Sequence, residues 1–315
     1  MRNPIEAKEL SRTFGDLVAV DGINLSVAKG EVFGFLGPNG AGKSTAVRML
    51  TTLLKPTSGQ AWVAGHNVMS SAGAVRKRIG VALQDAAIDP LMTGNELLKL
   101  QSVLHGIPKR KARARCGELL ETVGLTAAGD RRVGTYSGGM RRRLDLALSL
   151  VHEPEVLFLD EPTTGLDPTS RVALWDEVRK LNQEIGTTVF LTTQYLEEAD
   201  QLAQRIAIID EGRIVREGSP SVLKNQVGAP TLRVDVWEKD YNAAKATMAH
   251  FGEERPARKG RIAIGLNAGT RGITVVLKAL EDKSIEVQHV ELDEPSLDDV
   301  FADATGRRLE GGESA

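Results

Sequence analysis

The segment Gly37-Pro-Asn-Gly-Ala-Gly-Lys43-Ser44 restricts the possible folds of this chain more than any other, because it matches the pattern G-x-x-x-x-G-K-S/T at every fixed position. An almost wholly apolar run over residues 31–37 leads into it, and a helical pattern over 44–54 follows it. A strand, a glycine-rich turn and a helix in this order direct backbone N–H groups and a helix N-terminus toward one point, which suits phosphate oxygens. The sequence therefore predicts a phosphate-binding loop in a parallel α/β sheet.

The residue types in this loop indicate how it would hold a nucleotide. Lys43 is expected to reach the β- and γ-phosphates, and the Ser44 hydroxyl to coordinate Mg²⁺. A glycine-rich turn that merely closes a strand–helix unit is the alternative, and the matching flanks disfavour it. The residues expected to contact the nucleotide here are Gly37, Asn39, Gly40, Ala41, Gly42, Lys43, Ser44 and Thr45.

A second apolar run, residues 156–159, ends in the acidic pair Asp160 and Glu161. Ligands in such sheets bind at the carboxyl ends of the strands, so we expect Asp160 to meet the metal ion beside Ser44. Glu161 is then placed to accept a proton from an attacking water. An Asp-Glu pair that only caps the next helix is the less favoured alternative. The similar Leu292-Asp-Glu-Pro-Ser follows an alternating polar and apolar run, so no second metal site is predicted there.

The segment Tyr136-Ser-Gly-Gly-Met140 offers a second turn that can bind an anion, because a hydroxyl and exposed N–H groups precede a helix. Together with the phosphate loop and Asp160-Glu161-Pro162, it resembles the nucleotide-binding domain of ATP-binding-cassette (ABC) proteins, whose consensus there is Leu-Ser-Gly-Gly-Gln. Tyr136 and Met140 depart from that consensus, and the Ser-Gly-Gly centre is intact.

The resemblance implies an ATPase that uses ATP and Mg²⁺. It also implies a head-to-tail homodimer, in which the turn of one copy touches the γ-phosphate held by Lys43 of the other. The residues of this turn expected to contact the nucleotide are Ser137, Gly138 and Gly139.

Three further positions take their expected roles from the family. Phe14 matches the aromatic that stacks on adenine, and Gln84 matches the glutamine that links Mg²⁺ and water to a helical insertion. Gln194 stands where the family usually has a switch histidine. Glutamine can donate a hydrogen bond to the γ-phosphate but cannot carry a proton in this pH range, so Glu161 is the main base candidate. The expected catalytic residues are Glu161, Gln194 and Lys43, and the expected metal ligands are Ser44, Gln84 and Asp160.

The order of strand and helix patterns predicts two domains. Residues 4–228 read as a P-loop ATPase core with an antiparallel β subdomain and a helical insertion over about 85–150. Thr93 and Glu96 have capping-box spacing inside that insertion. Residues 229–315 alternate strand-like and helical runs, which predicts a small accessory α+β domain.

The composition limits the classes of partner and the cellular location that we expect for this chain. The formal net charge of -2 gives no basic field, so nucleic acid is not expected as a partner. A single cysteine fits a reducing cytosol. No apolar run approaches the roughly 18–20 residues of a membrane span, so we expect a cytoplasmic chain whose membrane part, if any, is another polypeptide.

Within the ABC family, the chain resembles the ATP-binding subunits of drug-resistance exporters, the daunorubicin/doxorubicin-resistance (DrrA-like) group. The phosphate loop, residues 192–200 and the C-terminal Ser296-Leu-Asp-Asp-Val-Phe301 carry this resemblance. It implies peripheral attachment to the cytoplasmic face of the membrane, a separate multi-span permease subunit and efflux of a hydrophobic compound or drug. The alternative is a soluble ABC ATPase that acts on ribosomes or DNA, which a single cassette without sustained heptads disfavours.

Overall fold

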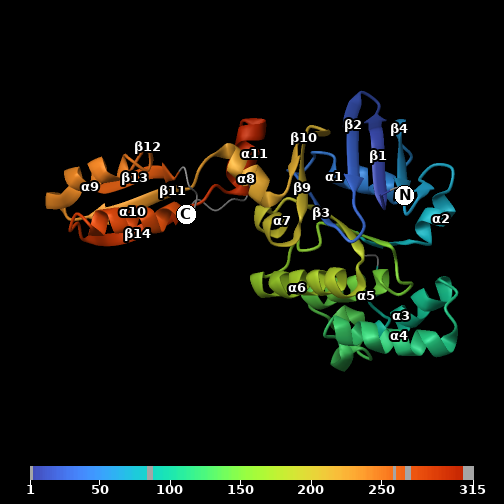
Figure 1. The fold of residues 1–315 in the computed structure, drawn as a ribbon. Coiled ribbons are helices and arrows are strands. Elements are labelled where there is room, and N and C mark those ends of the chain that lie inside the picture. The colour runs from blue at the N-terminus through green and yellow to red at the C-terminus, as the bar shows by residue number, and fades with distance from the viewer. Residues whose placement is uncertain (1–2, 84–87, 258–259, 267–270, 308–315) are drawn as a thin grey trace. The chain divides into compact units, whose positions relative to one another are not determined.

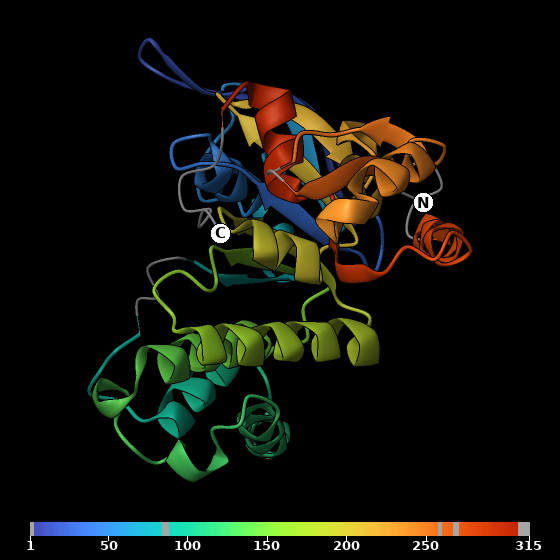
Figure 2. The same cartoon turned by 90° about the vertical axis from the view of Figure 1, so that its left-hand side faces the viewer.

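The computed structural model describes residues 3–83, 88–257, 260–266 and 271–307. These residues divide into two compact units, one over residues 3–220 and the other over residues 221–307 (Figures 1 and 2). None of the helices in these ranges is both long enough and apolar enough to cross a bilayer.

A six-stranded sheet in the order β10-β9-β3-β8-β7-β6 forms the centre of unit 1. The five strands from β9 to β6 run parallel, and β10 pairs antiparallel at the edge. The central strands β3, β7 and β8 are buried at every position, as expected for strands covered on both faces. The strands are β3 (Val32–Leu36), β6 (Ile79–Ala82), β7 (Val156–Asp160), β8 (Thr188–Thr193), β9 (Arg205–Asp210) and β10 (Arg213–Gly218).

A four-stranded antiparallel sheet and helix α1 (Lys43–Leu50) cover one face of this sheet, with apolar side chains of both sheets and α1 in one cluster. The Phe190 ring lies at its centre, 5.5–5.6 Å from the ring centroids of Phe33, Phe35 and Phe158. The strands are β1 (Ile5–Phe14), β2 (Leu17–Val27), β4 (Ser58–Val63) and β5 (His66–Asn67), and the short helix α2 (Ala72–Arg76) follows them.

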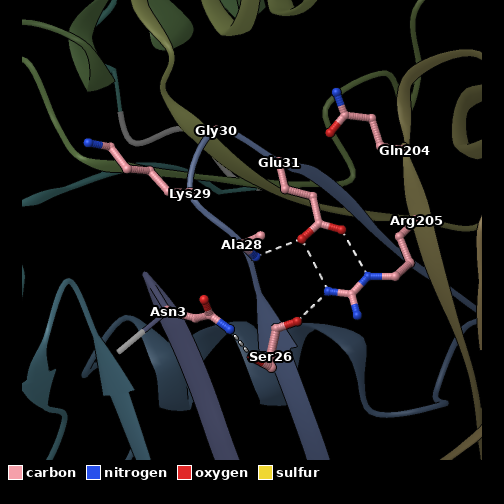
Figure 3. Close-up of a pocket in the computed structure, with 8 residues that line it drawn as sticks. All are labelled: Asn3, Ser26, Ala28, Lys29, Gly30, Glu31, Gln204 and Arg205. Carbon is pink, nitrogen blue, oxygen red and sulfur yellow. Dashed lines mark hydrogen bonds and ion pairs between the residues drawn. The ribbon is translucent and has the colours of Figure 1, made fainter. Parts of the chain in front are cut away.

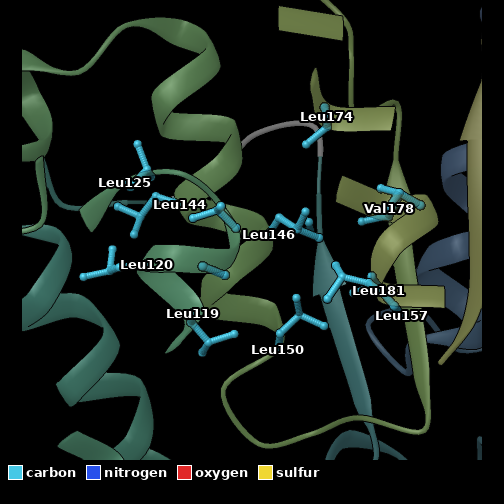
Figure 4. Packing of buried hydrophobic residues seen from close by; sticks show 14 of the residues in the cluster. Leu119, Leu120, Leu125, Leu144, Leu146, Leu150, Leu157, Leu174, Val178 and Leu181 are labelled. Atoms are coloured by element: carbon cyan, nitrogen blue, oxygen red, sulfur yellow. The ribbon is translucent and has the colours of Figure 1, made fainter. Parts of the chain in front are cut away.

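Helices cover the opposite face, where leucines of α4, α5 and α6 belong to one apolar cluster with side chains of β7 (Figure 4). The described residues between β6 and β7 form helices and turns but no strand, which confirms the predicted helical insertion. Thr93 and Glu96 form the predicted capping box, with both of its hydrogen bonds present. The helices are α3 (Gly94–Leu104), α4 (Lys109–Thr122), α5 (Gly138–Ser149), α6 (Pro168–Ile185) and α7 (Leu196–Leu202).

Unit 2 has a four-stranded antiparallel sheet in the order β12-β13-β11-β14. With its two helices in chain order this is the β-α-β-β-α-β arrangement of ferredoxin-like domains, and it confirms the predicted α+β class. The elements are β11 (Thr231–Val236), α9 (Tyr241–Met248), β12 (Gly252–Glu254), β13 (Arg261–Leu266), α10 (Arg271–Glu281) and β14 (Val287–Asp293), flanked in sequence by α8 (Pro220–Val227) and α11 (Leu297–Thr305). The three-residue strand β12 is too short to produce a period-2 pattern and was not predicted.

The helix predicted over 44–54 is shorter than its apolar pattern, because α1 ends at Leu50. Thr52 has φ of 67° and Leu53 is exposed, so the chain leaves the helix in turns. Periodicity alone did not reveal that end.

Helix α6 carries a half-buried carboxylate at Glu177, one oxygen of which lacks a hydrogen bond in the described part of the chain. The Glu177 Oε2 atom is buried and accepts no hydrogen bond among the described residues. Burial raises the pKa of Glu177 to about 7, against the opposing charges of Arg143 and Lys180.

We expect Glu177→Gln to stabilise the fold at pH 8 by about 1 kcal/mol, and by much less at pH 4. Because the folded pKa of Glu177 lies above its unfolded value near 4.5, wild-type stability falls as pH rises from about 4.5 through 7. Thermal melts of both chains at pH 4, 6 and 8 measure this difference. Glu184→Gln, at an exposed position of the same helix, is the control. Equal stabilisation at pH 4 and pH 8 would contradict the assignment.

Candidate functional site

The phosphate loop leaves the carboxyl end of β3 and passes close to neighbouring backbone. The Gly37 N–H donates to the Thr193 carbonyl at 3.2 Å, and a Cβ at Gly37 would lie 2.3 Å from the Ile209 carbonyl oxygen. Gly42 has φ of 104°, and a Cβ there would lie 2.3 Å from the Ala19 carbonyl oxygen. Both positions therefore require glycine, which explains the fixed glycines of the motif.

The Lys43 ammonium lies inside this loop. Its Nζ atom donates to the carbonyl oxygens of Gly37 and Pro38 at 2.8 and 2.9 Å, and stands 3.2 Å from Glu161 Oε1. The side chain is only 4% exposed. Burial lowers the pKa of Lys43, and the Glu161 carboxylate opposes that shift. The loop thus holds a cation among acceptors that phosphate oxygens can replace.

Ser44, in the first turn of α1, lies beside Asp160, the last residue of β7. The Ser44 hydroxyl donates to Asp160 Oδ1 at 3.2 Å, and the Thr192 hydroxyl donates to the same oxygen at 2.5 Å. Adjacent oxygen ligands of an octahedral Mg²⁺ ion stand about 3 Å apart, since each lies about 2.1 Å from the ion. The Ser44 and Asp160 oxygens therefore have the chemistry and spacing of two neighbouring magnesium ligands.

The backbone conformation and hydrogen bonds of Glu161 fix the position of its carboxylate. Its φ is 48°, an unusual value for a non-glycine residue and one that often occurs at active sites. Its N–H donates to the carbonyl and hydroxyl oxygens of Thr192, each at 3.1 Å, and its carboxylate accepts from the Thr164 hydroxyl at 3.3 Å. Together with Lys43, these contacts fix a carboxylate that is 6% exposed beside the phosphate loop.

The sequence-based predictions missed Thr192 and Thr164, which bond directly to the acidic pair. The available signal for Thr192 was its place at the carboxyl end of the apolar run 188–192, because β8, the strand of that run, lies between β3 and β7. Gln194 directly follows β8 and is half-buried.

The Ser-Gly-Gly turn begins α5. The Ser137 hydroxyl oxygen accepts from the Met140 N–H at 3.2 Å as the helix N-cap, while Ser137 and Gly138 remain exposed. Gly139 is buried, and a Cβ there would lie 2.8 Å from Ser170 Oγ. In the part of the chain that is described, no hydrogen bond or ion pair joins the Ser137 side chain to Lys43 of the same copy.

The remaining predicted residues lie around the loop. Phe14 ends β1, is 44% exposed and has the Arg12 guanidinium 4.4 Å from its ring centroid. Asn39 and Gly40 are exposed, Thr45 is half-buried, and Ala41 is buried. Gln84 lies outside the described residues.

Two family models match this chain. The model described as ABC transporter matches residues 20–164, and the C-terminal domain model of DrrA1-3-like ATP-binding proteins matches residues 218–305. The daunorubicin resistance ATP-binding protein DrrA2 of Streptomyces coeruleorubidus is 46% identical over 98% of this chain and 97% of its own. The chain belongs to the DrrA-like ATP-binding proteins of ABC transporters.

Other relatives agree with this membership. The daunorubicin/doxorubicin resistance ATP-binding protein DrrA of Streptomyces peucetius is 46% identical over 96% of this chain and 92% of its own. The dimeric structure of MJ0796, a bacterial ABC transporter cassette, matches 68% of this chain and 98% of its own at a TM-score of 0.63 and 27% identity. As a DrrA-like ABC protein the chain is an ATPase, and the alternative of a soluble protein acting on ribosomes or DNA is not favoured.

A hollow of about 420 Å³ lies at the opposite edge of the sheet, where β3 and β9 begin (Figure 3). There the Arg205 guanidinium bonds the Glu31 carboxylate at 2.8 Å and Glu217 at 2.7 Å. Glu31 also accepts from the Ala28 N–H at 2.7 Å. Because Arg205 pairs with both carboxylates, we assign the hollow a structural role.

Proposed function

We propose that this DrrA-like ATPase drives the export of a hydrophobic compound through a separate multi-span membrane subunit. The cluster of Lys43, Glu161, Ser44 and Asp160 carries the hydrolytic part of the proposal, because it joins a phosphate-binding cation, a metal-binding pair and a base. The resistance proteins named above support the cargo class. Binding to this membrane subunit would attach the chain to the cytoplasmic face of the membrane.

Bound Mg²⁺ supplies charge neutralisation on the β- and γ-phosphates. Ser44 and Asp160 would hold the ion, with Gln84 assigned by family resemblance. Glu161 accepts a proton as water attacks the γ-phosphorus. The bond from that phosphorus to the bridging oxygen breaks, and its electron pair leaves with ADP. Lys43 holds the β- and γ-phosphate oxygens during this step.

ATP lies between two copies in this proposal, with the loop of one copy facing the Ser137 turn of the other. The exposed Ser137 hydroxyl and the exposed Gly138 support it, because both are open to a second molecule. Phe14, also exposed, is the proposed adenine contact. We assign residues 4–228 to the ATP-binding domain and residues 229–315 to an accessory domain.

ATP hydrolysis by the purified chain tests the proposed chemistry. Phosphate release is expected with Mg²⁺ and is expected to stop when EDTA removes the ion. Hydrolysis at the same rate in excess EDTA would contradict the metal assignment. A vesicle assay with the co-purified membrane subunit then tests ATP-dependent movement of a hydrophobic dye.

We expect Gln194→His to keep hydrolysis at the wild-type level or above it. Glutamine already supplies a hydrogen-bond donor, and histidine supplies a donor and a titratable proton in the same place. Steady-state phosphate release at pH 7 and pH 8 measures the effect. Complete loss of hydrolysis in a folded Gln194→His chain would show that the glutamine has a specialised role.

A further inference from the structure

Arg142 on α5 is bonded to three backbone carbonyl oxygens from two other parts of the chain. Its Nε atom donates to Pro162 at 2.8 Å, its Nη2 atom to Asp160 at 2.9 Å and its Nη1 atom to Leu83 at 2.6 Å. Asp145 Oδ2 stands 3.3 Å from the same Nη1 atom. The Arg142 and Asp145 side chains are only 10% and 13% exposed, so this is a buried network.

The residues that carry these three carbonyl groups show which part of the site Arg142 holds in place. Asp160 and Pro162 are the residues on either side of Glu161, so two hydrogen bonds fix the backbone around the proposed base. Leu83 follows β6 and directly precedes the segment that contains Gln84. A planar guanidinium can donate in three directions at once, whereas a lysine ammonium cannot reproduce that fork.

The neighbouring arginines of α5 do not share this arrangement. Arg141 donates to the Tyr136 carbonyl at 3.2 Å, and Arg143 donates to the Val123 carbonyl at 3.2 Å. Each of these hydrogen bonds stays within the helical part of unit 1, since Tyr136 precedes α5 and Val123 caps α4. Among the described residues, Arg142 is therefore the one arginine of this run that is hydrogen-bonded to the residues on either side of Glu161.

We propose that Arg142, oriented by Asp145, is a positioning residue that sets Glu161 for ATP hydrolysis. It acts through hydrogen bonds to the backbone of Asp160 and Pro162. These bonds connect α5, the helix that begins after Ser137, to the backbone around Glu161 of the same copy. This inference rests on the proposed role of Glu161.

Arg142→Lys tests the inference, with Arg143→Lys as the matched control on the next residue. We expect Arg142→Lys to lower kcat by about 10- to 100-fold, because a small displacement of a catalytic group is costly. The Kd for ATP is expected to stay within about 2-fold, since the hydrogen bonds of Arg142 to described residues go to Leu83, Asp160 and Pro162 and none goes to the phosphate loop. Arg143→Lys is expected to keep kcat within about 2-fold. Equal kcat values for the two variants would overturn the inference.

Combination with Glu161→Gln separates positioning of the base from general loss of structure. If Arg142 acts through Glu161, Arg142→Lys lowers the residual kcat of the Glu161→Gln chain by much less than it lowers that of the wild type. An equal fold-loss in both backgrounds would overturn the inference. Normal turnover of Glu161→Gln alone would instead remove the proposed role of Glu161.

Asp145→Asn provides a milder variant that keeps the arginine. It removes the buried carboxylate beside Nη1 and leaves the three carbonyl acceptors in place. We expect a fall in kcat smaller than that of Arg142→Lys, again with unchanged Kd for ATP. Wild-type kcat in this variant would exclude the orienting role of Asp145, and loss of ATP binding in both variants would show a structural role instead.

Discussion

Replacement of Glu161 by glutamine is expected to lower kcat for ATP hydrolysis by about 10²–10⁴-fold while ATP binding survives. Glutamine keeps the shape of the side chain and its hydrogen bond from Thr164, but it cannot accept the proton of the attacking water. Lys43 loses its ion-pair partner at 3.2 Å and remains free to meet phosphate oxygens. Single-turnover phosphate release and binding of a fluorescent ATP analogue measure the two quantities separately.

Glu155→Gln is the matched control for this experiment. Glu155 directly precedes β7, pairs with Arg78 at 3.0 Å and is 61% exposed, so it lies at the other end of the same strand. We expect its kcat to stay within about 2-fold of wild type. Wild-type turnover by a folded Glu161→Gln chain would refute the assignment of the base.

A second prediction tests whether the ATP site is shared between two copies, as proposed above. Lys43→Ala removes the cation proposed to bind phosphate, and Ser137→Arg blocks the turn that faces the other copy in the proposed dimer. Each variant alone is expected to hydrolyse ATP at least about 10²-fold more slowly than wild type. An equal mixture is expected to recover activity up to about a quarter of wild type, because half the dimers then carry one intact site out of two.

Phosphate release from each variant and from their mixture measures this recovery. A mixture of Lys43→Ala with the double variant Lys43→Ala/Ser137→Arg is the control, since no dimer in it has an intact site. A mixture no more active than its components would contradict a site built from two copies. Recovery in the control mixture would contradict it as well.

The fold of unit 1 was predictable because its strongest signals are local. The apolar runs at 31–37, 156–159 and 188–192 became β3, β7 and β8, and the glycine loop connects β3 to α1 as expected. The two Leu-Asp-Glu-Pro segments differ in the burial of the strand that contains their Asp residue, and this difference distinguished the predicted metal ligand from the other aspartate. The first ends a fully buried strand, whereas Asp293 of the second lies on the exposed strand β14 and pairs with Arg233 at 2.9 Å.

The contacts that complete the site were not predictable to the same degree. Ser44 and Asp160 could be paired from motif and strand order, but the hydrogen bonds of Thr192 depend on which strand lies beside β7. The three carbonyl contacts of Arg142 come from Leu83, Asp160 and Pro162, and no periodicity in the sequence joins them. Strand order is a long-range property, so these contacts become visible only in the folded chain.

Capture of the Glu161→Gln chain from membranes tests whether this ATPase works with a separate membrane subunit. The tagged variant is incubated with ATP and Mg²⁺, then recovered from detergent-solubilised native membranes and, as a control, from the same material without nucleotide. We expect one multi-span membrane protein in fixed ratio to the chain, and ATP-dependent dye movement when both are placed in vesicles. Recovery of ribosomes or DNA-repair proteins without any membrane partner would contradict this proposal.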